Sequence, residues 1–358
     1  MRPRDVQKEV ARALRTKANL MILGAPGIGK TELCEYIAKE LSVAGKEIGF
    51  KRIVLPQYEE VDLRGVPEVN EKKRTVFYPT EELPYEDKDG KFGILLCDEL
   101  PSAKPAVQVI MHQLLDSRRL GSLYHLPEGW IIVMTGNRQE DYAFVFEMPT
   151  TVQTRVVRIT MDANFDDWKK WAYDTGKVEP EILAFLSNNL SDFINFTPDK
   201  PVSNHAIPRT WTQLSRYIKD VKENGDSLSM EYINGQVGEG SGNKFFGWHK
   251  VWQEVPDIDA ILDGKSVNVP KKVDIQWCVI SAILSKLIHR EKEAGVVVNC
   301  RNAFKYLTAM SSDIIMAFLN DIMQTKFWAG VKKKVVTSPE WIQLAKVHSK
   351  TIVGDVDA

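Results

Sequence analysis

The segment Gly24-Ala-Pro-Gly-Ile-Gly-Lys-Thr31 constrains the fold of this chain more than any other feature. It follows the apolar run Leu20–Leu23 and precedes a helical pattern in which Leu33 and Ile37 share one face. Glycines at these positions let the backbone form a concave nest of N–H groups, and the following helix adds the positive end of its dipole. The context therefore predicts a phosphate-binding loop between a buried strand and a helix, rather than a plain glycine-rich turn.

Composition narrows the class of protein. A chain of 358 residues is long for one hydrophobic core, so two or three domains are expected. The net charge of −1 excludes a global field that draws the molecule to nucleic acid or anionic membranes. The four cysteines form no C-x-x-C pair, and no apolar run has the length of a membrane span. We expect a soluble protein of a reducing compartment, the cytoplasm.

Apolar runs along the first half of the chain predict further buried strands. They are Arg52–Leu55, Phe92–Cys97, Trp130–Met134 and Arg155–Ile159, and helix-length segments separate most of them. This alternation predicts an α/β fold in which a five-stranded parallel sheet carries helices on both faces.

One connection is longer than a simple crossover needs. Residues 56–91 contain the strand-like run Arg74–Tyr78 and a turn signal at Asp89-Gly90, so we expect an inserted hairpin. Beyond Phe165 the pattern turns helical. Residues 225–247 are rich in Gly, Ser and Asn and are interpreted as a flexible linker, after which helical patterns return.

Carboxylates and an amide follow two of the predicted strands. Asp98 and Glu99 come directly after Ile94–Cys97, and Asn137 follows Trp130–Met134. Ligands sit at the carboxyl ends of strands in open α/β sheets. We expect Asp98 to hold Mg²⁺ together with Thr31, Glu99 to polarise the water that attacks a γ-phosphate, and Asn137 to contact both that phosphate and the water.

The predicted nucleotide and metal ligands follow from these motifs. The metal ligands are Thr31 and Asp98, and the cofactors are ATP and Mg²⁺. The loop residues expected to bind ATP are Gly24, Ala25, Pro26, Gly27, Ile28, Gly29, Lys30, Thr31 and Glu32.

As a set, these motifs resemble Walker A, Walker B and sensor 1 of AAA+ ATPases. The segments Asp98–Leu120 and Tyr58–Gly65 are similar to elements of the MoxR-type, helix-2-insert clade. The resemblance covers roughly residues 1–220 and implies a P-loop NTPase αβα sandwich with a helical lid. It implies a core at residues 1–163, a lid at 164–224, and a linker with a mostly helical region at 225–358.

The resemblance also carries two arginines over. Arg155 stands where family members place an arginine that reaches the γ-phosphate of a neighbouring subunit, with Arg158 as the alternative. Arg209 resembles sensor 2 at the start of a lid helix. These residues imply a homo-oligomeric ring, most simply a hexamer, that remodels a protein. The resemblance further implies a von Willebrand factor A-type partner.

Other functions stay open. A nucleic-acid motor or loader is disfavoured by the near-zero net charge and the lack of a recognisable DNA-binding domain. A scaffold that binds ATP to assemble and hardly hydrolyses it is disfavoured by the presence of Asp98, Glu99 and Asn137. A metabolite kinase is the least favoured, because nothing indicates an acceptor pocket.

Overall fold

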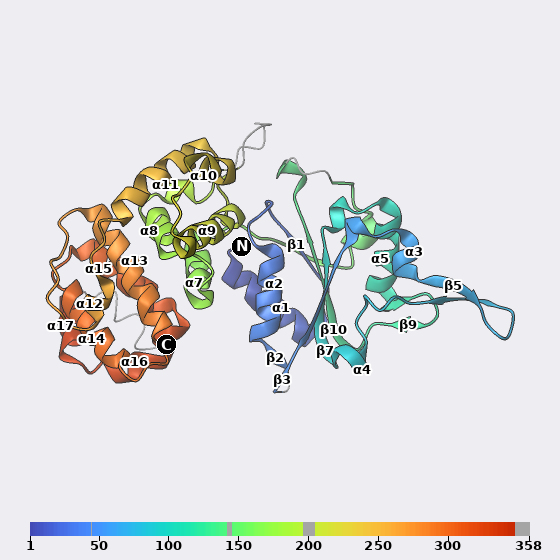
Figure 1. The fold of residues 1–358 in the computed structure, drawn as a ribbon. Helices are drawn as coiled ribbons and strands as arrows, with labels where there is room; N and C mark the ends of the chain where they lie inside the picture. Colours follow the sequence, from blue (N-terminus) through green and yellow to red (C-terminus); the bar gives the residue numbers. More distant parts are fainter. Residues whose placement is uncertain (44, 142–144, 196–204, 348–358) are drawn as a thin grey trace. The chain divides into compact units, whose positions relative to one another are not determined.

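The computed structural model describes residues 1–43, 45–141, 145–195 and 205–347 (Figure 1). The chain forms two compact units, Met1–Asn164 and Phe165–Ala358. The predicted boundary at residue 224 stays a prediction.

A five-stranded parallel sheet forms the centre of the N-terminal unit. Its order is β11-β1-β10-β7-β4, so the predicted parallel sheet is confirmed. The strands are β1 (Leu20–Leu23), β4 (Gly49–Val54), β7 (Phe92–Asp98), β10 (Gly129–Gly136) and β11 (Val157–Thr160). Parallel pairing brings the carboxyl ends of β1, β10 and β7, three neighbouring strands, to one edge of the sheet.

Alternating side chains of these strands feed two hydrophobic layers. On β1, Leu20 and Ile22 pack with α1 (Pro3–Thr16) and α2 (Lys30–Glu40) in one layer. Met21 and Leu23 pack in the other layer, which includes α5 (Pro105–Ser117). The same alternation continues on β7 and β10. The unit is therefore an αβα sandwich, with helices on both faces of the sheet (Figure 1).

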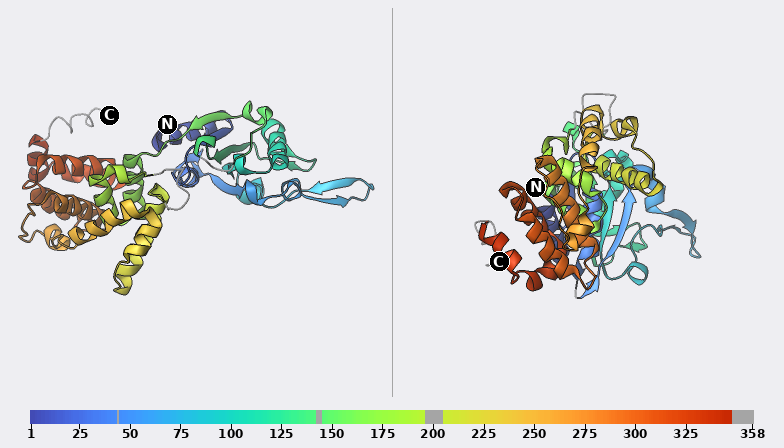
Figure 2. Two further views of the ribbon diagram at one scale, coloured as in Figure 1. Left: turned by 90° about the horizontal axis from the view of Figure 1, so that it is seen from above. Right: turned by 60° about the vertical axis from the view of Figure 1, so that its left-hand side comes forward.

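The insertion forms a hairpin within the predicted residues 56–91, and its second strand coincides with the predicted run Arg74–Tyr78. Strands β5 (Val66–Val69) and β6 (Thr75–Tyr78) pair antiparallel, and the hairpin projects away from the sheet (Figure 2). The predicted turn at Asp89-Gly90 is wrong, because these residues end the short helix α4 (Glu86–Asp89), with Gly90 at φ 89°. The smaller elements of this unit are β2 (Ser42–Val43), β3 (Lys46–Glu47), α3 (Glu60–Arg64), β8 (Arg119–Leu120), β9 (Tyr124–His125) and α6 (Thr150–Gln153).

The described part of the C-terminal unit is helical. Its helices are α7 (Phe165–Thr175), α8 (Pro180–Asn188), α9 (Pro208–Asn224), α10 (Met230–Val237), α11 (Glu239–Trp252), α12 (Ile258–Leu262), α13 (Val273–His289), α14 (Val296–Leu307), α15 (Ser312–Gln324), α16 (Lys326–Val335) and α17 (Pro339–Val347). The mostly helical C-terminal region is confirmed.

The flexible linker predicted at 225–247 is wrong, because α10 and α11 occupy most of it. Phe245 and Trp248 of α11 pack edge-on against Phe185 of α8, which anchors the helix to the core. Gly242 allows α11 to approach Asn234 of α10, since a Cβ there would collide with that side chain. Tertiary packing outweighs the low helix propensity of this glycine-rich segment.

Candidate active site

The predicted phosphate loop joins β1 to α2. Gly27 and Gly29 have φ angles of 70° and 93°, in the left-handed region that favours glycine. A Cβ at Gly24 would collide with the carbonyl oxygen of Met161, so this position also requires glycine. Gly29 caps α2 without any side-chain hydrogen bond. The first N–H groups of a helix have no acceptor within the helix itself, and this end of α2 follows the phosphate loop, which suits an anion.

Lys30 links the loop to the end of β10. Its Nζ donates hydrogen bonds to the carbonyl oxygens of Gly24 at 2.7 Å and Ala25 at 2.8 Å, and to Oδ1 of Asn137 at 2.9 Å. The side chain is only 8% exposed. This contact brings two of the predicted motifs together and places an ammonium group across the loop.

Asp98 is the last residue of β7, and its carboxylate accepts hydrogen bonds from the hydroxyl groups of Thr31 and Thr135. Thr31 Oγ1 lies 2.9 Å from Oδ2 and 3.2 Å from Oδ1 of Asp98. Thr135 Oγ1 donates to Oδ1. Asp98 is 3% exposed, so the structure buries a carboxylate among donors at the carboxyl edge of the sheet.

These oxygen donors fit a magnesium ion. Mg²⁺ prefers oxygen ligands and usually takes only one or two carboxylates, with substrate phosphates completing its shell. Asp98 and the hydroxyl of Thr31 supply that set. In the ranges that the structure describes, no group of three His, Cys, Asp or Glu side chains could hold a metal by itself.

Glu99 has an unusual backbone conformation. Its φ of 59° and ψ of 37° place a residue with a side chain in the left-handed region. The conformation follows the last residue of β7, and the Glu99 N–H points to Thr135 Oγ1 at 3.4 Å. The residue is exposed. A strained backbone of this kind is frequent at functional sites.

Two residues of the site were not predicted to act there. Arg52 of β4 donates from Nε at 2.9 Å and from Nη2 at 2.6 Å to Oδ2 of Asp98. Thr135 donates to Oδ1, as described above. Thr135 lies two residues before the predicted Asn137, so its position was close to a predicted motif. Arg52 stands beside a second cation, Lys51, in β4, and no local signal distinguishes the two.

Arg155 and Arg158 lie away from this site. Val157, the first residue of β11, pairs with Leu20, the first residue of β1. Arg155 therefore precedes the amino ends of the strands, whereas the phosphate loop follows their carboxyl ends. Arg155 Nε lies 2.8 Å from Oδ1 of Asp116, and this hydrogen bond lowers the pKa of Asp116. Arg158 is exposed on β11 and contacts Gln153.

The remaining predicted residues have these positions. Arg209 is exposed in the first turn of α9, in the C-terminal unit, and its predicted role stays a prediction. Glu32 is exposed in the first turn of α2, Ala25 and Pro26 are partly exposed, and Ile28 is buried.

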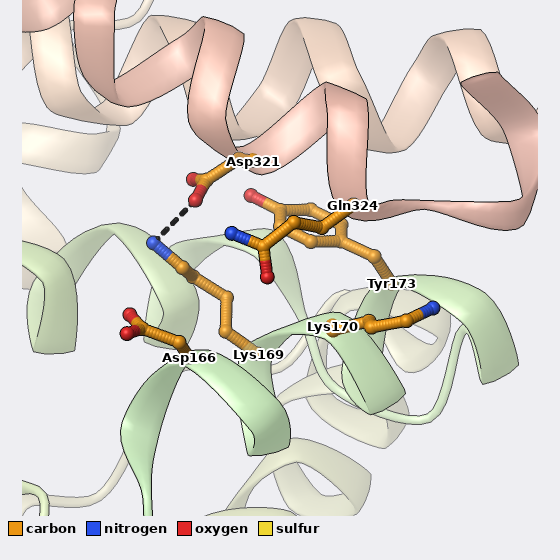
Figure 3. A pocket seen from close by; sticks show the side chains of 6 residues that line it. All are labelled: Asp166, Lys169, Lys170, Tyr173, Asp321 and Gln324. Atoms are coloured by element: carbon orange, nitrogen blue, oxygen red, sulfur yellow. Dashed lines mark ion pairs between the residues drawn. The ribbon is translucent and has the colours of Figure 1, made fainter. Parts of the chain in front are cut away.

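A small pocket lies in the C-terminal unit between α7 and α15 (Figure 3). An ion pair of 2.6 Å between Lys169 and Asp321 crosses it. Its space of about 10 Å³ suits a single water molecule, so it is no site for a nucleotide. None of the described helices is both long and apolar enough to cross a membrane.

No curated protein matches the chain in sequence. Similar solved structures include NtrX from Brucella abortus, 14% identical, covering 88% of this chain and 67% of that chain, with a TM-score of 0.40. A RuvB variant from Thermotoga maritima is 14% identical and covers 74% of this chain and 79% of that chain, with a TM-score of 0.40.

One protein family matches the part of the chain that contains the site. Residues 19–151 match the family described as AAA domain (dynein-related subfamily). This segment contains the phosphate loop, Asp98 and Asn137. This part of the N-terminal unit is therefore similar to AAA domains over the segment that forms the site.

Proposed function

We propose that this chain is a Mg²⁺-dependent ATPase whose site is the carboxyl edge of the sheet. The observation that supports this most is the hydrogen bond between Thr31 and Asp98, residues 67 positions apart in the chain. The Lys30–Asn137 contact, which spans 107 positions, supports it independently. Together they join the phosphate loop, the end of β7 and the end of β10.

The residues take complementary roles in this proposal. The backbone N–H groups of Gly27–Thr31 cradle phosphate oxygens, and Lys30 exchanges its carbonyl partners for the outer phosphates. Thr31 and Asp98 hold Mg²⁺, which supplies charge neutralisation at the β- and γ-phosphates when bound. Glu99, exposed beside them, orients the attacking water, and Asn137 contacts the γ-phosphate. Because phosphoryl transfer needs positioning and electrostatics rather than a covalent group, this set suffices.

The direct test is ATP turnover by the purified chain and its Glu99→Gln variant. We expect hydrolysis to fall by about 10²–10⁴-fold while ATP binding persists, because Gln keeps the size of the side chain but cannot act as a base. Glu128→Gln, an exposed glutamate of the same unit, serves as the control. Wild type and Glu99→Gln that bind ATP and are equally inactive would instead support the ATP-gated scaffold.

The position of Arg155 supports the proposal that the chain forms a ring of subunits. This residue lies at the amino edge of the sheet, away from the phosphate loop of its own chain, so a catalytic Arg155 must act on another copy. Asp116 holds its guanidinium at the surface. Contacts of this head-to-tail type close into rings, most simply a hexamer. Light scattering with ATP and Mg²⁺ tests this: a discrete oligomer supports the ring, and a persistent monomer contradicts it.

The finer assignment is a MoxR-type remodelling ATPase. In this proposal Arg209 reads the nucleotide from the helical lid, and the projecting β5–β6 hairpin acts on a protein substrate. Val66 and Val69 of β5 are 67% and 72% exposed, which suits a contact with another protein. A von Willebrand factor A-type partner completes the proposal. Loss of substrate remodelling on replacement of both valines by serine, with ATP turnover unchanged, tests the role of the hairpin.

A further inference from the structure

We infer that Arg52 is a resident counter-cation of Asp98 that competes with Mg²⁺ for this carboxylate and sets the Mg²⁺ concentration that the site needs. The inference deepens the proposed function and rests on its assignment of Asp98 as a metal ligand. It makes Arg52 a positioning residue, because it acts through Asp98.

The contact is a charge-assisted pair on one oxygen. Nε and Nη2 of Arg52 lie 2.9 Å and 2.6 Å from Oδ2 of Asp98. Thr31 donates to the same oxygen at 2.9 Å, and Thr135 donates to the other oxygen. A carboxylate offers about four lone-pair sites in total. Arg52 therefore occupies lone pairs that a cation would use.

The electrostatics of the site reinforce the competition. Asp98 is 3% exposed, and a buried carboxylate requires compensating charge or hydrogen bonds. Arg52 supplies a full positive charge where Mg²⁺ would supply two. The two cations repel each other at this short range, so each weakens the binding of the other.

Strand order explains why Arg52 is there and how it can leave. β4 is an edge strand of the sheet and pairs with β7, with Val54 opposite Asp98. Arg52 therefore reaches forward along the neighbouring strand to the carboxylate. Its side chain is 47% exposed although its partner is buried. The guanidinium can swing into water without unpacking the core, which a reversible counter-cation requires.

The test measures metal binding without relying on hydrolysis. Mg²⁺ alone is titrated into wild type, Arg52→Gln and Arg52→Lys, and the midpoint is read from thermal stability. The same titration is repeated with a fluorescent ATP analogue. Arg12→Gln is the control, because it also removes one paired surface arginine, on α1.

We expect the half-saturating Mg²⁺ concentration to fall about tenfold in Arg52→Gln, since a repulsive charge beside the metal is gone. Arg52→Lys keeps the charge but loses the two-nitrogen contact, so its half-saturating Mg²⁺ concentration should lie between those of wild type and Arg52→Gln. Arg12→Gln should match wild type. An unchanged or higher Mg²⁺ requirement in both Arg52 variants would overturn the inference. If wild type binds no nucleotide at all, the proposed function fails, and the titration with Mg²⁺ alone still decides the role of Arg52.

Discussion

Both units of the molecule bury charged side chains, but they do so in different surroundings. In the N-terminal unit, Asp98 takes donors from Thr31 of α2, Thr135 of β10 and Arg52 of β4, three separate elements of the unit. In the C-terminal unit, Asp192 is held by Ser241 and Lys244, both from α11. Buried charge is thus common to both units. Convergence at strand ends is what distinguishes the proposed site.

The neighbourhood of the two carboxylates differs as well. Asp98 is followed by Glu99, whose backbone is in the left-handed region and whose side chain is exposed. The residue after Asp192 has no such backbone conformation, because Phe193 has ordinary helical φ and ψ angles. The Asp192 carbonyl oxygen accepts the indole N–H of buried Trp211. Asp192 is therefore surrounded by packed helices, whereas Asp98, the metal ligand of the proposed site, lies beside an exposed residue in the left-handed region.

The largest effect on ATP turnover is expected when the charge of Asp98 is removed, and the same change at Asp192 serves as the comparison. Asp98→Asn should lower ATP turnover by about 10²–10³-fold, because the site loses an electrostatic group that acts on the transferring phosphate. Asp192→Asn should lower stability and leave turnover per folded molecule unchanged. Steady-state kinetics and urea unfolding measure both variants. An equal loss of ATP turnover in Asp98→Asn and Asp192→Asn would contradict a distinct role for Asp98.

A second test uses the buried pair of the small pocket. Lys169→Met leaves Asp321 buried without its partner and should cost about 3 kcal/mol of unfolding free energy. Burial raises the pKa of Asp321, and Lys169 opposes that rise. A carboxyl whose folded pKa is raised stabilises the fold below its unfolded pKa, and this contribution is lost as pH rises through the folded pKa. The variant should therefore lose more stability at pH 8 than at pH 5.

Tryptophan fluorescence in urea measures this loss, since Trp130 is the only one of the nine tryptophans that precedes residue 165. ATP binding by the variant should match that of wild type. A loss of stability that does not depend on pH would contradict the role given to Asp321.

Cysteine labelling compares the two units within one molecule. Each unit contains two buried thiols, Cys34 and Cys97 in the first and Cys278 and Cys300 in the second. Burial raises the pKa of Cys34 and Cys300 to about 12, so labelling at pH 8 requires opening of the fold. ATP with Mg²⁺ at 100 times its dissociation constant should slow labelling of the first pair by up to ~100-fold and leave the second pair unaffected. Mass spectrometry of the labelled peptides gives both rates, and equal protection of all four thiols would argue against a nucleotide site confined to the N-terminal unit.

The smallest effect concerns the backbone at Glu99. Glu99→Gly removes the same carboxylate as Glu99→Gln but also removes the Cβ that disfavours a φ of 59°. We expect Gly to raise stability by up to about 1 kcal/mol relative to Gln, with both variants inactive. Thermal unfolding of the pair measures this. Equal melting temperatures would show that the site stores no backbone strain.

Much of the sheet was predictable because each site motif directly follows an apolar run. The loop after Leu20–Leu23 and the carboxylates after Ile94–Cys97 needed only the rule that parallel strands end at a common edge. The contact of Arg52 with Asp98 was not predictable in this way, because it depends on β4 lying beside β7. Strand order is a property of the whole fold and leaves little trace in a local sequence window.

The errors have a similar origin. Residues 225–247 have the composition of a linker, yet aromatic side chains such as Phe245 and Trp248 bury against distant helices and hold α11 in place. The hairpin of the insertion exists, but its turn is formed by Asn70–Arg74, where Asn70 Oδ1 accepts the N–H groups of Lys72 and Arg74. Asp89-Gly90 has the composition of a turn and instead ends a helix.

The measurement that tests the account most directly mixes two inactive variants. Arg155→Ala should be defective because it cannot complete a neighbour's site, and Glu99→Gln because it cannot activate water in its own. In a ring with random order, an equal mixture regains intact sites wherever a subunit with Glu99 lies beside one with Arg155. We predict recovery of about a quarter of wild-type turnover at concentrations that support assembly. A mixture as inactive as either variant alone would contradict a site shared between copies of this chain.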